Sequence, residues 1–169
     1  MIADHNGVGG ARHVVDKLTE MLYEGELAWG CIVAAATLGT RSASGSYYPN
    51  ALLANVAKMH GTRALWNAAR LGVDIAGGLI MTSPSAKDMN HPELGPLIEK
   101  YMKANPQVKT EDRIKMMRLM EYLTGIGCIL VAESTQGGAP VVVQQMVVQG
   151  ELSKRLEEYK KRVLELAEI

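Results

Sequence analysis

The 169-residue sequence has no phenylalanine and only 5% aromatic residues, and it is also poor in cysteine. The two cysteines, Cys31 and Cys128, are far apart and lie outside any Cys-x-x-Cys spacing. This excludes a disulfide framework and a typical zinc site, because both need cysteines in number or at short spacing. A reducing cytoplasm is therefore the expected compartment.

The chain has no excess of either charge, since 18 basic residues balance 18 acidic ones. No overall field attracts nucleic acid or an anionic membrane, and weak self-repulsion favours oligomers. The longest uncharged apolar run, residues 27–38, is shorter than the roughly 20 residues of a bilayer span and predicts a helix buried on all sides. The opening MIADHNG lacks the basic flank and apolar core of a signal peptide. We expect neither a nucleic-acid partner nor a membrane.

Several catalytic motifs are missing as well. No glutamate is followed three residues later by a histidine, which excludes a ferritin-like di-iron site. The sequence has no GxGxxG after a strand, no P-loop and no HExxH. Its four histidines share no spacing and are interpreted as capping, surface or core residues: His5, His13, His60 and His91.

Helices are favoured by what the chain contains, since ten methionines and many alanines fill its apolar positions. We predict an all-α fold, an antiparallel helical bundle in a single domain over residues 1–169. Pro and Gly set the predicted boundaries, Asn50 and Thr110 are the expected N-caps, and Gly25 and Gly30 interrupt the first helix. The helices are expected at residues 2–38, 50–76, 92–104, 110–134, 141–148 and 151–167. The valine-rich residues 141–148 also fit a strand, but the flanking proline and glutamines favour a short buried helix.

Two glycine turns lie against predicted helix ends, where free backbone N–H groups can meet an anionic ligand. The first is DIAGG at residues 74–78, and the second lies within ESTQGGAP at residues 133–140. Glu133, at the end of an apolar helix, is expected to be partly buried, which favours its protonated form and suits proton transfer. The alternative is a helix-end glutamate bonded to nearby backbone. Gly137 and Gly138 either let a cofactor approach or form a plain turn.

Two further polar groups are weaker candidates. The turn at residues 82–85, TSPS, offers hydroxyls such as those of Thr82 and Ser83 to a phosphate or CoA group, although such turns are mostly helix caps. Asn55, Lys58 and Thr62 fall on one helical face and are either a polar contact to a cofactor or another chain, or a solvated face.

The sequence resembles a known flavoprotein family in four ordered segments. These are IADHNGV with ARHVVDKLTEM, then YYPNALLANVAKMH, then DIAGG followed by TSPSAKDMNHPE, and finally a Glu-Ser pair before a glycine turn. They are similar to the C-terminal part of the family of 4-hydroxyphenylacetate 3-hydroxylase and 4-hydroxybutyryl-CoA dehydratase (vinylacetyl-CoA isomerase). The resemblance implies a helical domain like the C-terminal four-helix domain of acyl-CoA dehydrogenases, and a homo-oligomer, a dimer or tetramer.

The resemblance also implies an FAD site shared with an N-terminal part of the enzyme. Family members carry Glu-Ser-x-His-Gly near flavin and substrate, so it implies that Glu133 is catalytic. Gln136 replaces the histidine, and residues 137–140 look one residue short; glutamine can donate a hydrogen bond but cannot shuttle a proton. The implied cofactor-binding residues are Ser134, Gln136, Gly137, Gly138, Asn55, Lys58, Thr82 and Ser83.

The implied activity depends on segments outside this sequence. The family's iron–sulfur ligands and phenol-binding groups lie upstream, and Cys31 and Cys128 match neither set, so no metal ligand is assigned here. We expect a C-terminal domain or subunit that completes an FAD site and a tetramer interface. With an N-terminal partner chain it would support aromatic hydroxylation, fed by a flavin reductase, or hydroxyacyl-CoA dehydration and isomerisation, and the motifs lean to the second. The alternative is a non-catalytic helical oligomerisation protein left from a split gene.

Overall fold

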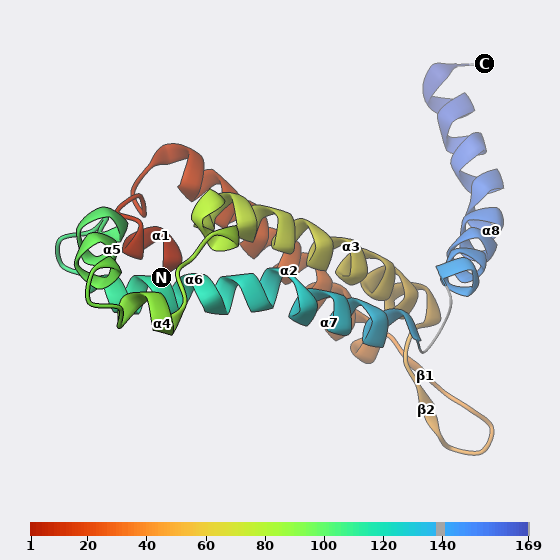
Figure 1. The fold of residues 1–169 in the computed structure, drawn as a ribbon. Coiled ribbons are helices and arrows are strands. Elements are labelled where there is room, and N and C mark those ends of the chain that lie inside the picture. The colour runs from red at the N-terminus through yellow and green to blue at the C-terminus, as the bar shows by residue number, and fades with distance from the viewer. Residues whose placement is uncertain (138–140, 169) are drawn as a thin grey trace. The chain divides into compact units, whose positions relative to one another are not determined.

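The computed structural model of the protein describes residues 1–137 and 141–168, without the side chains of residues 133 and 135–137. It confirms the all-α prediction. The described strands form one short hairpin of two strands with two residues each (Figure 1). Among the described residues, no helix is both long and apolar enough to cross a membrane. The elements are α1 (Ile2–His5), α2 (Arg12–Thr37), β1 (Thr40–Arg41), β2 (Tyr47–Tyr48), α3 (Ala51–Ala76), η1 (Gly78–Met81, a 3₁₀ turn), α4 (Ala86–Met89), α5 (Leu94–Met102), α6 (Thr110–Thr124), α7 (Ile126–Gly137) and α8 (Val141–Ala167).

The described chain forms two compact units, and α2, α3 and α7 each contribute to both. Unit 1 comprises Met1–Tyr23 and Ala64–Ala132, and unit 2 comprises Glu24–Arg63 and Glu133–Ile169. The single-domain prediction stays a prediction, and each unit is described by itself.

The core of unit 1 is formed by side chains from segments that are far apart in the sequence. These segments are α1, the start of α2, the end of α3 with η1, and α6. Met117 lies at its centre with 0% of its surface exposed. Gly72 brings α3 close to α6, because a Cβ added there would lie 3.0 Å from Thr124 Cγ2. The buried residues of this cluster are Ile2, Ala3, Val14, Ile75, Ala76, Ile80 and Met117.

A polar network fastens α1 to this core. The Asn6 amide donates to the Ala76 carbonyl at 3.1 Å, and Arg113 Nε donates to Asn6 Oδ1 at 2.9 Å. Arg113 also donates to the Met102 carbonyl, at the end of α5. Arg113 is only 7% exposed, and its burial lowers the pKa of its guanidinium. Its donors thus satisfy acceptors from two other parts of the chain, at Asn6 and at Met102.

Ion pairs and hydrogen bonds fix the register of α2 against α3. In unit 1, Lys17 Nζ lies 2.5 Å from Asp74 Oδ2, and the Asn67 amide donates to Glu20 Oε1 at 2.7 Å. The Lys17 ammonium holds the pKa of Asp74 below its ordinary value. In unit 2, His60 Nε2 lies 3.0 Å from Glu24 Oε2. Glutamates of α2 therefore face polar groups of α3 in both units.

Unit 2 contains the β1–β2 hairpin that joins α2 to α3. Thr40 pairs with Tyr48 and Arg41 with Tyr47, and Gly45 turns the hairpin at φ 85°. The Tyr47 hydroxyl donates to the Ala36 carbonyl at 2.7 Å, holding the hairpin to the end of α2. Asn50 Oδ1 accepts from the Leu53 N–H at 3.0 Å, which confirms the predicted cap of α3.

Several predicted boundaries are wrong. Residues 6–11, with Gly7 at φ 71°, separate α1 from α2, whereas Gly25 and Gly30 lie inside an unbroken α2. Thr110 does not cap α6, because its hydroxyl donates to the Glu99 carbonyl instead. The predicted helix over 110–134 is divided at Gly125, where a Cβ would lie 2.8 Å from the Glu121 carbonyl oxygen.

The predicted burial of two apolar helices is also wrong for this chain by itself. Trp29, within the run 27–38, is 62% exposed, and the valines that open α8 are exposed as well. The valine-rich segment is helical, as predicted, but it continues through Gly150 into the charged helix as one α8. Gly150 lies inside α8, and no atom lies within 4 Å of the Cβ that another residue would carry there. These surfaces need a partner to become buried.

Candidate functional site

The TSPS turn leads from η1 into α4 and is built by its own side chains. Gly77 precedes η1 at φ 80°, a conformation that side chains rarely adopt. Ser85 caps α4: the Asp88 N–H donates to Ser85 Oγ at 3.3 Å, and the Ser85 N–H donates to Asp88 Oδ2 at 2.8 Å. The Ser85 N–H and the Ser85 hydroxyl both donate to Asp88 Oδ2, and these hydrogen bonds hold the pKa of Asp88 below its ordinary value. Ser85 and Asp88 form a capping box, which sets the start of α4.

The two candidate hydroxyls of this turn are placed differently. Ser83 is buried, and its hydroxyl donates to the Leu79 carbonyl at 2.7 Å and lies 3.6 Å from Met117 Sδ. Arg118, on α6, donates to the Ser83 carbonyl. Thr82 is exposed and lines an apolar hollow, so it is the residue that a ligand reaches more easily.

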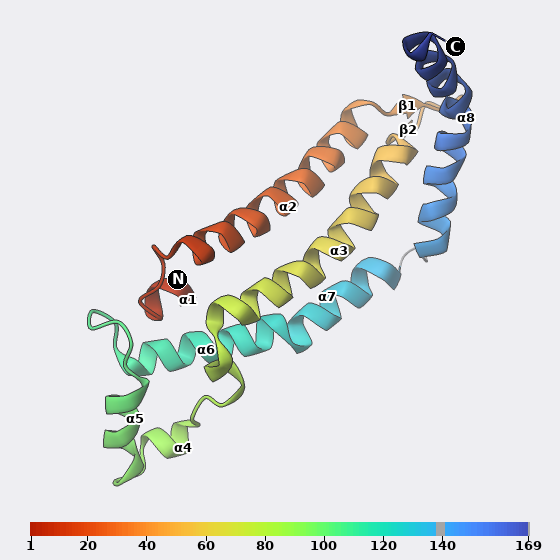
Figure 2. The same ribbon diagram turned by 90° about the horizontal axis from the view of Figure 1, so that it is seen from above.

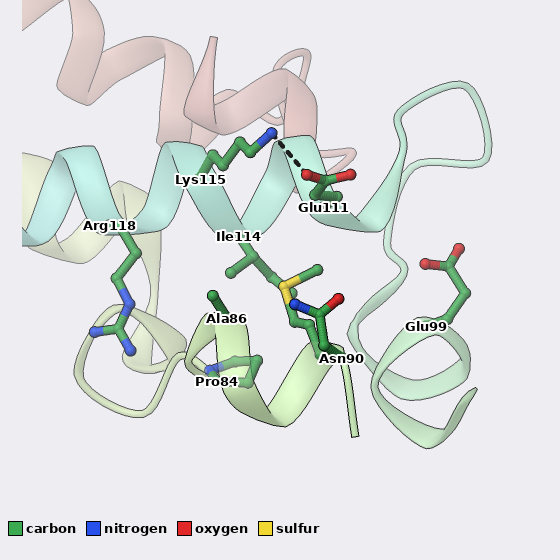
Figure 3. A pocket seen from close by; sticks show the side chains of 9 residues that line it. Pro84, Ala86, Asn90, Glu99, Glu111, Ile114, Lys115 and Arg118 are labelled. Carbon is green, nitrogen blue, oxygen red and sulfur yellow. Dashed lines mark ion pairs between the residues drawn. The ribbon is translucent and has the colours of Figure 1, made fainter. Parts of the chain in front are cut away.

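A hollow of about 520 Å³ lies in unit 1 between the turn and α6. Figure 3 shows Pro84, Ala86 and Asn90 on one side of it and Glu111, Ile114, Lys115 and Arg118 of α6 on the other. Figure 2 shows α5 crossing the N-terminal end of α6, which adds Glu99 to the rim. The spacing of Lys115 and Arg118 places both cations on one face of α6.

The charges at this hollow are compensated. Lys115 Nζ lies 2.7 Å from Glu111 Oε1, and Arg118 lies 2.6 Å from Glu121 Oε2. The Lys115 ammonium lowers the pKa of Glu111, and the Glu111 carboxylate raises the pKa of Lys115. Both groups stay charged near neutral pH, whereas general acid–base catalysis works best with a pKa near the working pH. The hollow is therefore suited to binding rather than to proton transfer.

A second hollow, of about 390 Å³, is mainly apolar. Leu94, Leu97 and Tyr101 project from one face of α5, and Thr82 and Pro84 close the opposite wall. Such a lining accepts an apolar group and offers one hydroxyl at its edge.

Asn55, Lys58 and Thr62 share a face of α3, within unit 2, as their spacing predicts. The Asn55 amide donates to the Ala51 carbonyl at 2.7 Å, and the Thr62 hydroxyl to the Lys58 carbonyl at 3.0 Å. Lys58 is half-buried and forms no ion pair with any residue that the structure describes. Its ammonium is therefore available to an anionic group.

The remaining candidates lie at the end of α7. The helical backbone of α7 includes Glu133, Gln136 and Gly137, but the structure does not describe the side chains at these positions. Gly138 lies outside the described residues. Ser134 is described and exposed. The roles assigned to these residues stay predictions.

Sequence reasoning missed Lys115 and Arg118. Their spacing on one face of α6 was visible, but nothing local indicates that the TSPS turn lies opposite them. His91 Nδ1 accepts from the Glu93 N–H at 3.2 Å in the turn before α5, whose N-cap residue is Glu93. Within residues 1–137 and 141–168 the side chains described form no group of three His, Cys, Asp or Glu able to hold a metal ion.

The fold and these turns define a class. The helices have the fold of an all-α C-terminal helical domain. Within that class the chain belongs to the HpaB family, described as 4-hydroxyphenylacetate 3-hydroxylase C terminal, whose model matches residues 1–168. The family resemblance seen in the sequence is thereby confirmed.

Two relatives illustrate the similarity in sequence. The chain is 34% identical over 170 residues to the 4-hydroxybutyryl-CoA dehydratase/vinylacetyl-CoA-Delta-isomerase of Clostridium aminobutyricum, covering 93% of this chain and 34% of the relative. It is 26% identical over 116 residues to the oxygenase component of 4-nitrophenol 4-monooxygenase/4-nitrocatechol 2-monooxygenase of Rhodococcus opacus, covering 68% and 22%. The chain thus spans about a third of the length of the dehydratase.

Solved structures agree. An oxygen-tolerant archaeal 4-hydroxybutyryl-CoA dehydratase from N. maritimus matches with a TM-score of 0.84 and 34% identity, over 99% of this chain and 34% of that one. The oxygenase component HpaB of 4-hydroxyphenylacetate 3-monooxygenase, complexed with FAD and 4-hydroxyphenylacetate, matches with a TM-score of 0.79 over 98% of this chain and 36% of that one. At 20% identity the second likeness shows the fold alone.

Proposed function

We propose that this chain is the C-terminal helical part of a flavin-dependent enzyme that dehydrates and isomerises a hydroxyacyl-CoA. The observation that carries the proposal is the 34% identity to a 4-hydroxybutyryl-CoA dehydratase/isomerase over 93% of the chain. The oxygenases are less similar, at 26% and 20% identity. Aromatic hydroxylation, with a flavin reductase as a further partner, is therefore the less supported branch.

The proposed contribution of the chain to an FAD site rests on its donor set. Lys58 is a half-buried cation without a described carboxylate partner, and it shares a face of α3 with the Asn55 amide. Such a pair fits the pyrophosphate of FAD, which needs positive charge and hydrogen-bond donors. In the same unit, the end of α7 adds Ser134, Gln136, Gly137 and Gly138 to the proposed donor set. Exposed Thr82 of unit 1 is proposed separately, as a contact for a phosphate or CoA group. The rest of the FAD site, and any iron–sulfur ligands, are proposed to come from an N-terminal partner.

FAD, when bound, would supply electron transfer, which no side chain of this segment provides. The proposed task of Glu133 is to hold a proton on its carboxyl oxygen and exchange it with the substrate. Gln136 would orient a ligand through its amide, because glutamine does not titrate. Lys58 and Asn55 would position the cofactor.

The first test is the visible absorption spectrum of the chain purified with and without a co-expressed N-terminal partner taken from the dehydratase relative. Flavin retained by the complex, and weakened by Lys58→Met, is the expected result. Lys87→Met is the matched control, because Lys87 is an exposed lysine outside the proposed donor set. A complex that forms but stays colourless would contradict the proposal.

Glu133 is tested by turnover of the reconstituted complex with a hydroxyacyl-CoA. Glu133→Gln is expected to remove turnover while the flavin spectrum stays unchanged, because the amide keeps the shape but cannot carry the proton. Glu158→Gln, on the exposed surface of α8, is the control. Unchanged turnover in Glu133→Gln would overturn the proton-transfer role.

A second candidate is a non-catalytic helical oligomerisation protein. The observation that favours it is the apolar surface left exposed on α2, where Trp29, Leu22 and Leu27 are open. A folded helical dimer or tetramer, colourless with and without the partner, would favour this candidate over the enzyme.

A further inference from the structure

The hollow of about 520 Å³ beside α6 combines an apolar lining with polar groups. Ile114, which lines it from α6, is only 3% exposed, and half-buried Met89 and Pro84 extend the apolar surface on the side of α4. Gly95 brings α5 close to α4, because a Cβ added there would lie 2.5 Å from the Met89 carbonyl oxygen. Backbone packing therefore fixes this wall, and a flat apolar ring can lie against it.

The charged side chains that line this hollow cancel one another. Two are acidic and two are basic: Glu99, Glu111, Lys115 and Arg118. Lys115 is paired with Glu111, and Arg118 with Glu121. A free phosphate or carboxylate would gain little here, because it would have to compete with a carboxylate that is already bound. A neutral ring is therefore a better match than an anion.

Two polar groups of the hollow are available to such a ring. The Asn90 side chain, at the end of α4, forms no hydrogen bond with any residue that the structure describes. The Glu99 carboxylate lies 3.9 Å from Lys103 Nζ, which is beyond hydrogen-bond distance. Asn90 and Glu99 are both exposed, so a ligand can reach them, and Figure 3 shows them on the neighbouring helices α4 and α5.

The hydrogen-bonding pattern of these two groups selects a particular kind of ring. An amide both donates and accepts, whereas an ionised carboxylate only accepts. The complementary ring carries an amine beside a ring nitrogen, and adenine has this edge, to which asparagine can form two hydrogen bonds. The amine has two hydrogens, so Glu99 can accept the second. Guanine and the base of inosine carry an oxygen in place of this amine, and the Glu99 carboxylate would repel that oxygen.

We propose that this hollow binds the adenine ring of an acyl-CoA. The Arg118 guanidinium, held by Glu121 and the Ser83 carbonyl, supplies a planar group on which a base can stack. Pro84 also lines the second, mainly apolar hollow, which has the exposed Thr82 hydroxyl in its wall. That hollow suits the neutral pantetheine chain of CoA. The choice of CoA rests on the proposed function, whereas the adenine site rests on the hollow alone.

The experiment is an NMR titration of the whole isotope-labelled chain, without a partner, with adenosine, inosine, CoA and FAD in turn. Adenosine should shift the signals of the Asn90 side-chain amide, and inosine should bind at least about tenfold more weakly, because its oxygen replaces the amine. CoA should bind more tightly than adenosine, because its pantetheine chain adds contacts in the second hollow. FAD should bind at these signals no more tightly than adenosine.

Three variants sharpen the test. Glu99→Gln should remove most of the preference for adenosine over inosine, because a glutamine amide can donate to the inosine oxygen. Glu93→Gln makes the same change at the N-cap of α5, outside the lining, and should leave the preference in place. Asn90→Ala should weaken adenosine binding by about tenfold, with the helical circular dichroism unchanged, because this exposed side chain bonds to no described residue.

Equal binding of adenosine and inosine, or no adenosine-induced shift at Asn90, would overturn the adenine site. An unchanged preference in Glu99→Gln would do the same. FAD binding more tightly than CoA at these signals would overturn the assignment to CoA and indicate the cofactor instead.

Failure of the proposed function would look different. Adenosine binding as expected, beside a reconstituted complex that stays colourless and inactive, would support this site and contradict the flavin enzyme. A coloured, active complex whose chain binds no adenosine at Asn90 would do the reverse.

Discussion

The core around Met117 and helix α8 are both rich in apolar residues, but only the first buries them. Met117 is fully enclosed by α1, α2, α3 and α6 side chains, whereas Met146 of α8 is 64% exposed. Within the described part of α8, Gln144 is buried. An apolar pattern therefore indicates which face of a helix is meant to be covered, and not whether the same chain covers it.

The largest expected effect is on the free energy of unfolding, when a methionine is shortened either in the core around Met117 or in α8. Met117→Ala should lower the free energy of unfolding by about 2–5 kcal/mol, because it removes a fully buried side chain and leaves a cavity. Met146→Ala, the matched change in α8, should stay within about 0.5 kcal/mol. Urea unfolding followed by circular dichroism measures both. Equal effects would mean that α8 is packed as tightly as the core.

A smaller loss is expected when the α1 network is opened. Arg113→Ala should cost about 1–3 kcal/mol, because it leaves Asn6 Oδ1 and the Met102 carbonyl without their buried donor. Arg162→Ala on α8 should cost nothing measurable, since that guanidinium forms no hydrogen bond or ion pair with a described residue. Hydrogen exchange of the α1 amides gives an independent readout, and unchanged protection in Arg113→Ala would contradict the assigned role.

Two glycines of α3 should respond with opposite sign. Gly61→Ala should stabilise by about 0.5–1 kcal/mol, because alanine favours a helix and nothing lies within 4 Å of its new Cβ. Gly72→Ala should destabilise, because its Cβ would meet Thr124 Cγ2 at 3.0 Å. Thr124 cannot turn away without losing the hydrogen bond from its hydroxyl to the Met120 carbonyl, at 2.7 Å. Thermal unfolding distinguishes the two, and a stabilising Gly72→Ala would show that α3 and α6 can separate.

The smallest effect concerns pH. Lys115→Met should raise the pKa of Glu111 back towards 4.5, because it removes the ammonium that lowers it. Lys154→Met should do the same for Glu151 in α8. The stability from each depressed carboxyl is present above its unfolded pKa and lost as pH falls through its folded pKa. Carbon-detected NMR titration of the two side chains follows this directly, and an unchanged Glu111 titration would contradict the ion pair at the hollow.

Much of the fold could be predicted, because capping residues and glycines near the helix ends set where several helices begin and end. Asn50 caps α3, Gly77 ends it, and the long helices follow from apolar spacing. The break at Gly125 could not be predicted, because it depends on how closely the preceding turn approaches that residue. The end of α1 could not be predicted for a similar reason. The Asn6 side chain forms hydrogen bonds with Ala76 and Arg113, which are far away in the sequence, so no local pattern indicates them.

The candidate site was predictable only in its local parts. Spacing alone placed Asn55, Lys58 and Thr62 on one face of α3, and the TSPS turn was found from its hydroxyls. The meeting of that turn with Lys115 and Arg118 is a tertiary contact, which periodicity does not encode. Ser83 looked like a ligand contact, whereas its hydroxyl donates to Leu79 within the turn.

The link between Asn6 and Arg113 joins positions 107 residues apart, which constrains the order of folding during synthesis. A four-residue helix such as α1 is unstable alone, because helix nucleation costs more than so few hydrogen bonds return. Its docking surface on α6 leaves the ribosome only after roughly a hundred further residues have been made. The residues of α1 are therefore made long before the surface that holds them, and they find their native contacts late in folding.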